Sequence, residues 1–241
     1  MIRRFLLLPL LPLLASIGCS SPQPYVNTIG VLLPGSTMTV HVADAPFSAY
    51  APEVSQRHSV FTISATALPK GTPPPAPQLR SQRSGVVVAA PNPLAALLVR
   101  VPQKVDLVVD SQRGDVTVTE ISGNVRVKAA RGNVTLMVPG YAQASTVRGN
   151  LKVTMGATDW PGTLSFSSQQ GDVELWIGTN ASFTVHLHTD SGTLFTDFGL
   201  QGSSSGSSET IDGSVNGGGP QHIDVETKSG AIRLLRLQPQ A

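Results

Sequence analysis

The sequence predicts an all-β protein whose short strands stack as the coils of a parallel β-solenoid. Three observations lead to this prediction. A unit centred on glycine recurs seven times between Val105 and Leu235. Apolar residues stand seven and five residues before each of these glycines and return two residues after it, as expected for strands with one buried face. The chain is also poor in charged residues (13%) and aromatic residues (5%), which suits a narrow aliphatic core.

Residues 1–18 are predicted to be a lipoprotein signal peptide. Arg3 and Arg4 precede an apolar run that is too short and too interrupted by proline for a membrane span. The segment Ser16 to Cys19 resembles the bacterial lipobox, although serine stands where leucine is more frequent. Cys19 is the only cysteine, so no intramolecular disulfide can form. An ordinary secretory signal with an incidental cysteine is the alternative.

The lipobox resemblance implies that Cys19 is the lipidation site, carries acyl chains such as palmitate and anchors the mature protein to a membrane. Serine follows it, which in a double-membraned organism implies the outer membrane. Residues 19–30 would then form a tether. Loss of Arg3 and Arg4 reduces the 17 basic residues to 15, equal to the 15 acidic ones. Without a net positive charge, no nucleic-acid partner is expected.

Residues 31–241 are predicted to form a single β-helical domain. Residues 31–104 would supply capping strands, because an open solenoid end exposes unpaired backbone groups. The proline-rich segment 69–84 is expected to be a surface loop without a core. At the other end, Arg236 and Pro239 are expected to discourage strand addition. Alternating apolar residues predict strands in the N-terminal part within 31–51, 58–68, 85–90 and 97–102.

The corner repeats occupy residues 105–237. Asp or Asn follows five of the corner glycines, and both these residues and glycine tolerate the left-handed backbone of sharp turns. The glycines are 9, 9, 17, 22, 21 and 38 residues apart. Two short steps or one long step therefore make a coil of roughly 17 to 22 residues. The structural corner glycines are Gly114, Gly123, Gly132, Gly149, Gly171, Gly192 and Gly230.

The last interval contains an insertion at 201–219, rich in serine and glycine, which is expected to be a mobile excursion without a core. The alternative fold is an antiparallel β-sandwich or meander of hairpins. A hairpin at Gly114 would place Arg113 opposite Val116 and Ser111 opposite Val118, and this pairing of polar with apolar residues favours the solenoid.

The chain resembles the bacterial DUF4097 family, whose members are labelled adhesins by inference. The resemblance covers residues 31–237 and rests on three motifs: Val101-Pro102, Gly114-Asp115-Val116 and Thr227-Lys228-Ser229-Gly230-Ala231-Ile232. It implies a right-handed β-helix outside the cytoplasm, associated in some bacteria with envelope-stress signalling. The family has no established catalytic residues to transfer. The lipobox and the Ser/Gly insertion depart from many members.

Two groups of side chains are candidates for a site. Alignment of the last two units places His186 level with Asp224, and His188 level with Glu226, as a metal cluster or as a solvated charge ladder. The ladder is preferred, so no metal and no cofactor are predicted. A second group could line one edge and meet an anionic glycan or a lipid head group, although a solvated turn edge is preferred. It consists of Arg113, Arg131 and Arg148.

No catalytic residues are predicted. A glycan-cleaving β-helix needs convergent carboxylates, and the acidic residues show no pair repeated at coil spacing: Asp110, Asp115, Glu120, Asp159, Asp172, Glu174 and Asp190. The predicted function is a lipid-anchored, non-enzymatic envelope protein whose surface binds or adheres to an unknown envelope polymer or protein. An envelope-stress sensor or scaffold is the alternative. A polysaccharide-active enzyme, dependent on Asp172 or Glu174, ranks below both.

Overall fold

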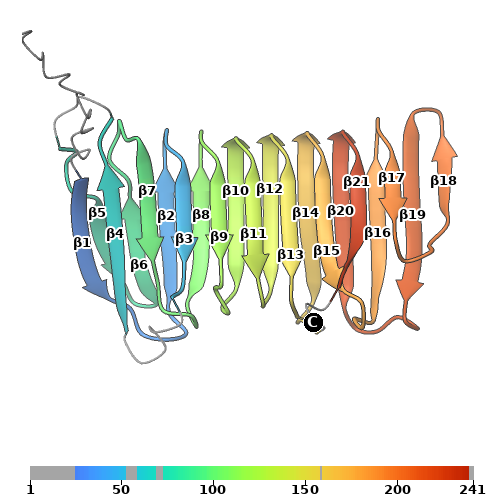
Figure 1. Ribbon diagram of the computed structural model, residues 1–241, viewed down its shortest axis with the longest axis horizontal. Helices are drawn as coiled ribbons and strands as arrows, with labels where there is room; N and C mark the ends of the chain where they lie inside the picture. Colours follow the sequence, from blue (N-terminus) through green and yellow to red (C-terminus); the bar gives the residue numbers. More distant parts are fainter. Residues whose placement is uncertain (1–24, 53–58, 69–72, 158, 239–241) are drawn as a thin grey trace, which may run out of the picture.

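The computed structural model describes residues 25–52, 59–68, 73–157 and 159–238, so the predicted signal peptide and Cys19 lie outside the described residues. The described chain forms 21 strands and no helix, and hence has no helix suited to crossing a membrane. Its strands form two sheets that run together along one long axis (Figure 1). Most neighbouring strands are parallel, which confirms the predicted all-β solenoid.

Each coil contributes one strand to each sheet. Sheet A has the order β1 (Tyr25–Val31), β4 (Val60–Thr66), β7 (Ala96–Arg100), β3 (Phe47–Tyr50), β9 (Val116–Thr119), β11 (Val134–Val138), β13 (Leu151–Met155), β15 (Val173–Gly178), β21 (Ile232–Leu237), β17 (Leu194–Thr196). Sheet B has the order β18 (Gly202–Ser205), β19 (Ser208–Val215), β16 (Phe183–Thr189), β20 (His222–Ser229), β14 (Thr163–Gln170), β12 (Ala142–Arg148), β10 (Val125–Arg131), β8 (Asp106–Ser111), β2 (Thr37–Val42), β6 (Gly85–Ala89), β5 (Gln78–Gln82).

The core lies between the two sheets. Parallel strands in register place equivalent residues on top of one another, so the apolar position five residues before each corner becomes a buried column along the axis. The inward column of sheet B contains Val109, Val127, Ala144, Phe166, Val225 and Leu187, all of them buried. Stacked aliphatic columns, expected from the repeat, are therefore the main contact between coils.

Six of the seven predicted corner glycines lie where the chain passes from sheet B to sheet A. Five of them have positive φ angles, for example 131° at Gly132 and 147° at Gly149. A Cβ added to Gly132 would lie 2.2 Å from the carbonyl oxygen of Gly114, and the same contact recurs from coil to coil. Gly123 instead lies at the opposite corner, between β9 and β10, packed against the Val105 carbonyl. The backbones thus stack too closely for any side chain.

Two polar ladders accompany this glycine column. After four of these glycines, an Asx side chain accepts a hydrogen bond from the backbone N–H of the neighbouring coil, as between Asp115 Oδ1 and the N–H of Asn133 (2.8 Å). The ladder continues through Asn150 and Asp172. Three residues before the glycine, a buried hydroxyl donates to a corner carbonyl of the neighbouring coil, as Thr227 does to Gly171 (3.1 Å). These bonds satisfy polar groups that would otherwise be costly to bury.

Spatial order does not follow sequence order at either end. The final coil, β20 with β21, inserts between the coil of β14 and β15 and the coil of β16 and β17. Likewise, β2 and β3 insert between β6 with β7 and β8 with β9. The expectation that Arg236 protects the C-terminal edge is therefore wrong, because β21 is an interior strand. Among the described strands, β17 and β18 form that end of the two sheets.

The ends of the stack switch to antiparallel pairing, and three predictions are corrected there. Residues 25–30 are part of β1, which pairs with β4, so the predicted tether cannot extend to residue 30. Within the predicted loop 69–84, residues 78–82 form β5, which pairs with β6 as a hairpin; residues 69–72 lie outside the described residues. The prolines of this segment predicted a loop. The strand was missed because an edge strand can be polar, with no apolar face to produce an alternating pattern.

The third correction concerns the insertion 201–219, which is ordered rather than a mobile excursion. It forms the hairpin of β18 and β19, and β19 pairs antiparallel with β16 over the whole length of β16. Ile211 and Val215 are buried, and Leu200 fills the space beside Gly213. Two buried aliphatic side chains and a full backbone ladder were sufficient to order a segment whose composition resembles a linker.

Candidate functional site

The outer face of sheet B carries the polar side chains that the alternation turns away from the core. Register aligns them in rows parallel to the long axis. The central row contains His41, Asp110, Lys128, Ser145, Ser167, Glu226 and His188. Residues far apart in the sequence thus meet on one continuous surface.

A groove of about 710 Å³ runs along this face. It draws lining residues from seven neighbouring strands of sheet B, which at about 4.8 Å per strand corresponds to a length of roughly 29 Å. Small side chains make up part of the groove lining. These are Ala43, Ala90, Ala130, Ser145 and Ser167. Its shape, long and open, can accommodate an extended chain.

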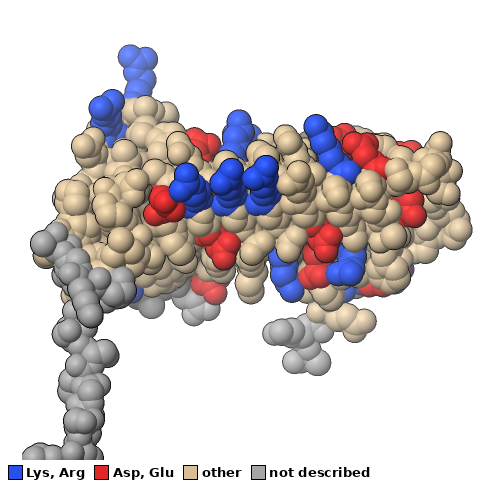
Figure 2. Space-filling model, turned by 90° about the horizontal axis from the view of Figure 1, so that it is seen from above, with Lys and Arg blue, Asp and Glu red and all other residues tan. Residues whose placement is uncertain are grey.

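An arginine column, defined as Arg113, Arg131 and Arg148, follows the glycine edge beside the groove. Arg131 and Arg148 are directly opposite in the register, and Arg113 lies level with them on the preceding coil. Figure 2 shows a row of cationic side chains along this edge. Arg113 pairs with Asp44 at 3.4 Å. In the described part of the chain, the guanidinium groups of the other two arginines have no ion-pair or hydrogen-bond partner.

The histidine and carboxylate candidates meet at the C-terminal end of the same face. The register places His186 beside Asp224 and His188 beside Glu226, as the alignment predicted. Ligand-type atoms of His186, Asp224 and Glu226 all lie within 4.8 Å of one another. On the other side of His186, its Nδ1 lies 2.7 Å from Oδ1 of Asp212 on β19. This hydrogen bond raises the pKa of His186, while partial burial opposes the shift.

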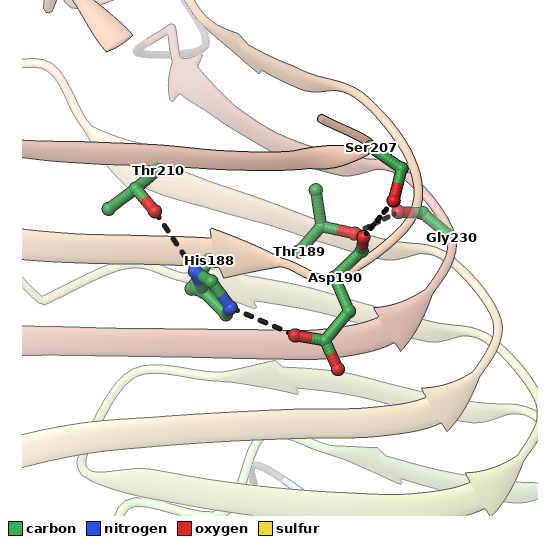
Figure 3. A network of polar contacts seen from close by, with 6 residues as sticks. All are labelled: His188, Thr189, Asp190, Ser207, Thr210 and Gly230. Carbon is green, nitrogen blue, oxygen red and sulfur yellow. Dashed lines mark hydrogen bonds and ion pairs between the residues drawn. The ribbon is translucent and has the colours of Figure 1, made fainter. Parts of the chain in front are cut away.

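His188 is not part of this three-residue group. Its Nδ1 lies 2.9 Å from the Thr210 hydroxyl, and its Nε2 lies 3.0 Å from Oδ1 of Asp190 (Figure 3). Its ring stacks on that of His186, with centroids 6.2 Å apart. Both ring nitrogens of His188 therefore have partners outside the three-residue group.

The two residues proposed for the enzyme alternative have structural partners. Asp172 Oδ1 accepts the N–H of Ala231 at 2.8 Å as part of the Asx ladder. Glu174 accepts from the indole N–H of Trp176 (2.7 Å) and pairs with Lys152 (3.1 Å). The indole hydrogen bond, helped by Lys152, lowers the pKa of Glu174. A general acid needs the opposite shift.

Sequence reasoning missed Asp212 and the groove. Asp212 falls in the insertion that was expected to lack structure, and nothing in the repeat indicates that β19 pairs with β16. Ser145 and Ser167 occupy equivalent outward positions of neighbouring strands, and Ala130 lies two residues beyond the equivalent position, Lys128, on β10. Ala130, Ser145 and Ser167 could have been found by aligning the units on their glycines and examining the outward positions.

The family model described as Toastrack DUF4097 matches residues 100–235, more than half of the chain. A solved structure from Clostridium sporogenes, provisionally described as a cell adhesion protein, is similar over 88% of this chain and 100% of its own, with 9% identity and a TM-score of 0.47. A protein of Bacteroides fragilis, provisionally described as an adhesin, covers 88% of this chain and 98% of its own, with 8% identity and a TM-score of 0.38. No curated protein matches the sequence.

Proposed function

Since this chain belongs to the Toastrack DUF4097 family, we propose that it is a lipid-anchored, non-enzymatic protein of the cell envelope that binds an anionic envelope polymer along the outer face of sheet B. Phosphate- or carboxylate-bearing glycans are the polymer class that this surface fits. The family assignment agrees with the resemblance inferred from the corner motifs. The location outside the cytoplasm and the adhesive role are parts of the proposal.

The arginine column is the observation that carries the proposal. Equal charges on neighbouring strands repel one another, and an exposed ion pair such as Arg113 with Asp44 contributes little to stability. A row of guanidinium groups at strand spacing is therefore better explained by a ligand than by folding. Arginine forms paired hydrogen bonds with phosphate and carboxylate groups, and a linear polyanion presents such groups at repeated intervals.

The groove gives the polymer a path beside these charges. Its lining residues Gln112, Ala130 and Val147 directly precede the three arginines in the sequence. A chain lying in the groove would therefore contact small side chains and the charged side chains of Asp110, Lys128 and Glu226 below, and guanidinium groups at one rim. Such an arrangement supports binding of an extended chain over several coils, where each contact is weak and their number supplies the affinity.

The test compares binding of two charge-matched variants to immobilised anionic and neutral glycans. The soluble chain starting at Ser20 retains every described strand. We expect R131Q/R148Q to weaken binding to polyanions about tenfold or more, since two charge-assisted contacts are lost. The affinity should also fall with added salt.

The control variant is R80Q/R83Q, which removes the same charge outside the arginine column, in and next to the edge strand β5. It should bind like the wild type. Equal weakening by both variants would mean that only net charge matters, and the groove would lose its role. Absence of saturable binding to every anionic polymer would remove the proposed function.

The anchor is tested separately because Cys19 lies outside the described residues. In cells labelled with a palmitate analogue, the wild-type protein should carry the label and sediment with membranes. C19S should lose the label and appear in the soluble fraction, since an acyl chain supplies about 0.8 kcal/mol of membrane affinity per buried methylene. An unlabelled wild-type protein, or a labelled C19S variant, would contradict the anchor.

A further inference from the structure

We propose that His186, Asp224 and Glu226 form a divalent-cation site that takes Zn²⁺. The site goes beyond the proposed polymer binding and does not depend on it. It is assembled from strands β16 and β20, which are adjacent only because the final coil inserts beside β16. Three side chains with ligand-type atoms within 4.8 Å of one another, all on the outer face, provide one imidazole and two carboxylates.

The geometry is close to that of a zinc site. With bonds of about 2.0 to 2.2 Å in a tetrahedral arrangement, ligand atoms lie roughly 3.4 Å apart. Side-chain rotations that close the group by about 1.5 Å or less would reach this separation. Because the ligands are outward-facing and Glu226 is exposed, such rotations do not disturb the core.

Asp224 provides a second observation that points to a ligand. Its Oδ1 is inaccessible to solvent and has no hydrogen-bond partner among the described residues. A buried carboxylate oxygen without a donor is costly, and a cation bound to the Asp224 carboxylate would offset this cost by neutralising its charge. Oδ1 is the one such side-chain atom found in the described part of the chain.

Asp212 provides a third observation that points to a metal. Histidines that bind metals usually donate their other ring N–H to a carboxylate, which orients the ring and selects the tautomer. The Nδ1 of His186 lies 2.7 Å from the Asp212 carboxylate, which leaves Nε2 as the nitrogen available for a metal. The parallel stacking of His188 on His186 (7° between planes) further holds the ring in place.

The donor set favours zinc over the hard cations. Mg²⁺ and Ca²⁺ prefer oxygen ligands alone, whereas an imidazole with carboxylates suits Zn²⁺. Three protein ligands leave the fourth position of a tetrahedral site open for water or for an oxygen of an external ligand. This is the pattern of a zinc site that interacts with something outside the protein.

The experiment is a Zn²⁺ titration of the untagged chain starting at Ser20, in competition with a chromophoric chelator. We expect one tight Zn²⁺ per chain, an increase in melting temperature on loading, and no displacement by millimolar Mg²⁺. E226Q and H186Q should each lower the affinity at least tenfold, since each removes a ligand. D212N should lower it about 10- to 100-fold through the second shell.

H41Q and D110N are the matched controls, because they alter another histidine–carboxylate pair of the same face (His41 Nδ1 to Asp110 Oδ2, 3.2 Å) without touching the three ligands or their neighbours. They should leave the affinity within about threefold of the wild-type value, a smaller change than the second-shell effect. Melting curves recorded with excess chelator verify that all variants are folded. Absence of saturable Zn²⁺ binding, wild-type affinity in E226Q and H186Q, equal losses in the controls, or equal competition by Mg²⁺ would each overturn the proposal.

Discussion

Replacement of Gly149 by alanine is expected to destabilise the protein by about 4 kcal/mol or more, or to prevent folding. Gly149 has a φ of 147°, and an added Cβ would lie 2.0 Å from the carbonyl oxygen of Gly132. The contact is with backbone, so no side-chain rotation can relieve it. The two coils would have to separate, which breaks their strand pairing. Denaturant unfolding of the chain starting at Ser20 measures the effect.

Gly162 is the control for this substitution. Its φ is also positive, at 73°, but an added Cβ would have no atom within 4 Å. G162A should therefore lower the free energy of unfolding only by the cost of a left-handed backbone at a non-glycine residue, about 1 to 2 kcal/mol. The difference between the two variants isolates the close stacking of the coils. If G149A cost no more than G162A, the account of the glycine column would be wrong.

Replacement of Phe183 by alanine is expected to cost about 3 to 5 kcal/mol of folding free energy. Phe183 is fully buried on β16, with its ring 5.9 Å from that of Trp160 and 5.5 Å from that of Phe198. It therefore joins the strand to two loops near the C-terminal end of the stack. Equilibrium unfolding monitored by tryptophan fluorescence should detect both the loss and the changed environment of Trp160.

Phe195 offers a comparison with the same chemical change. It lies on β17 with 53% of its surface exposed, so F195A should change stability by less than about 0.5 kcal/mol. Similar losses in F183A and F195A would show that the effect of the first does not come from burial at the aromatic cluster.

The solenoid was predictable from the sequence because both of its signals, the apolar alternation and the corner glycines, act locally. The alternation around each corner determines which residues face the core, and the glycines mark positions where the backbones approach closely. Gly132 and Gly149 lie at the predicted corners with the predicted backbone. The position of His186 beside Asp224 was also predictable, since residues at equal distances from their corner glycines lie beside each other on stacked coils.

The order of the coils was not predictable from the same signals. All corners are chemically alike, so the pattern around Gly230 does not specify whether its coil follows β16 or β14. The hairpin of β18 and β19 was missed for a related reason: its ladder depends on backbone hydrogen bonds, which composition does not encode. Because this hairpin was missed, the position of Asp212 and its hydrogen bond to His186 were missed as well.

The insertion of β20 and β21 between earlier coils has a consequence for biosynthesis. A chain synthesised from its amino terminus can add coils one by one as far as β15, but β16 then lacks β20, the neighbour that separates it from β14 in the finished sheet. That neighbour is the last segment to emerge. We therefore expect the stack to be completed only after the carboxyl terminus is released. In chains truncated before residue 222, strands β16 to β19 should be unable to join the stack.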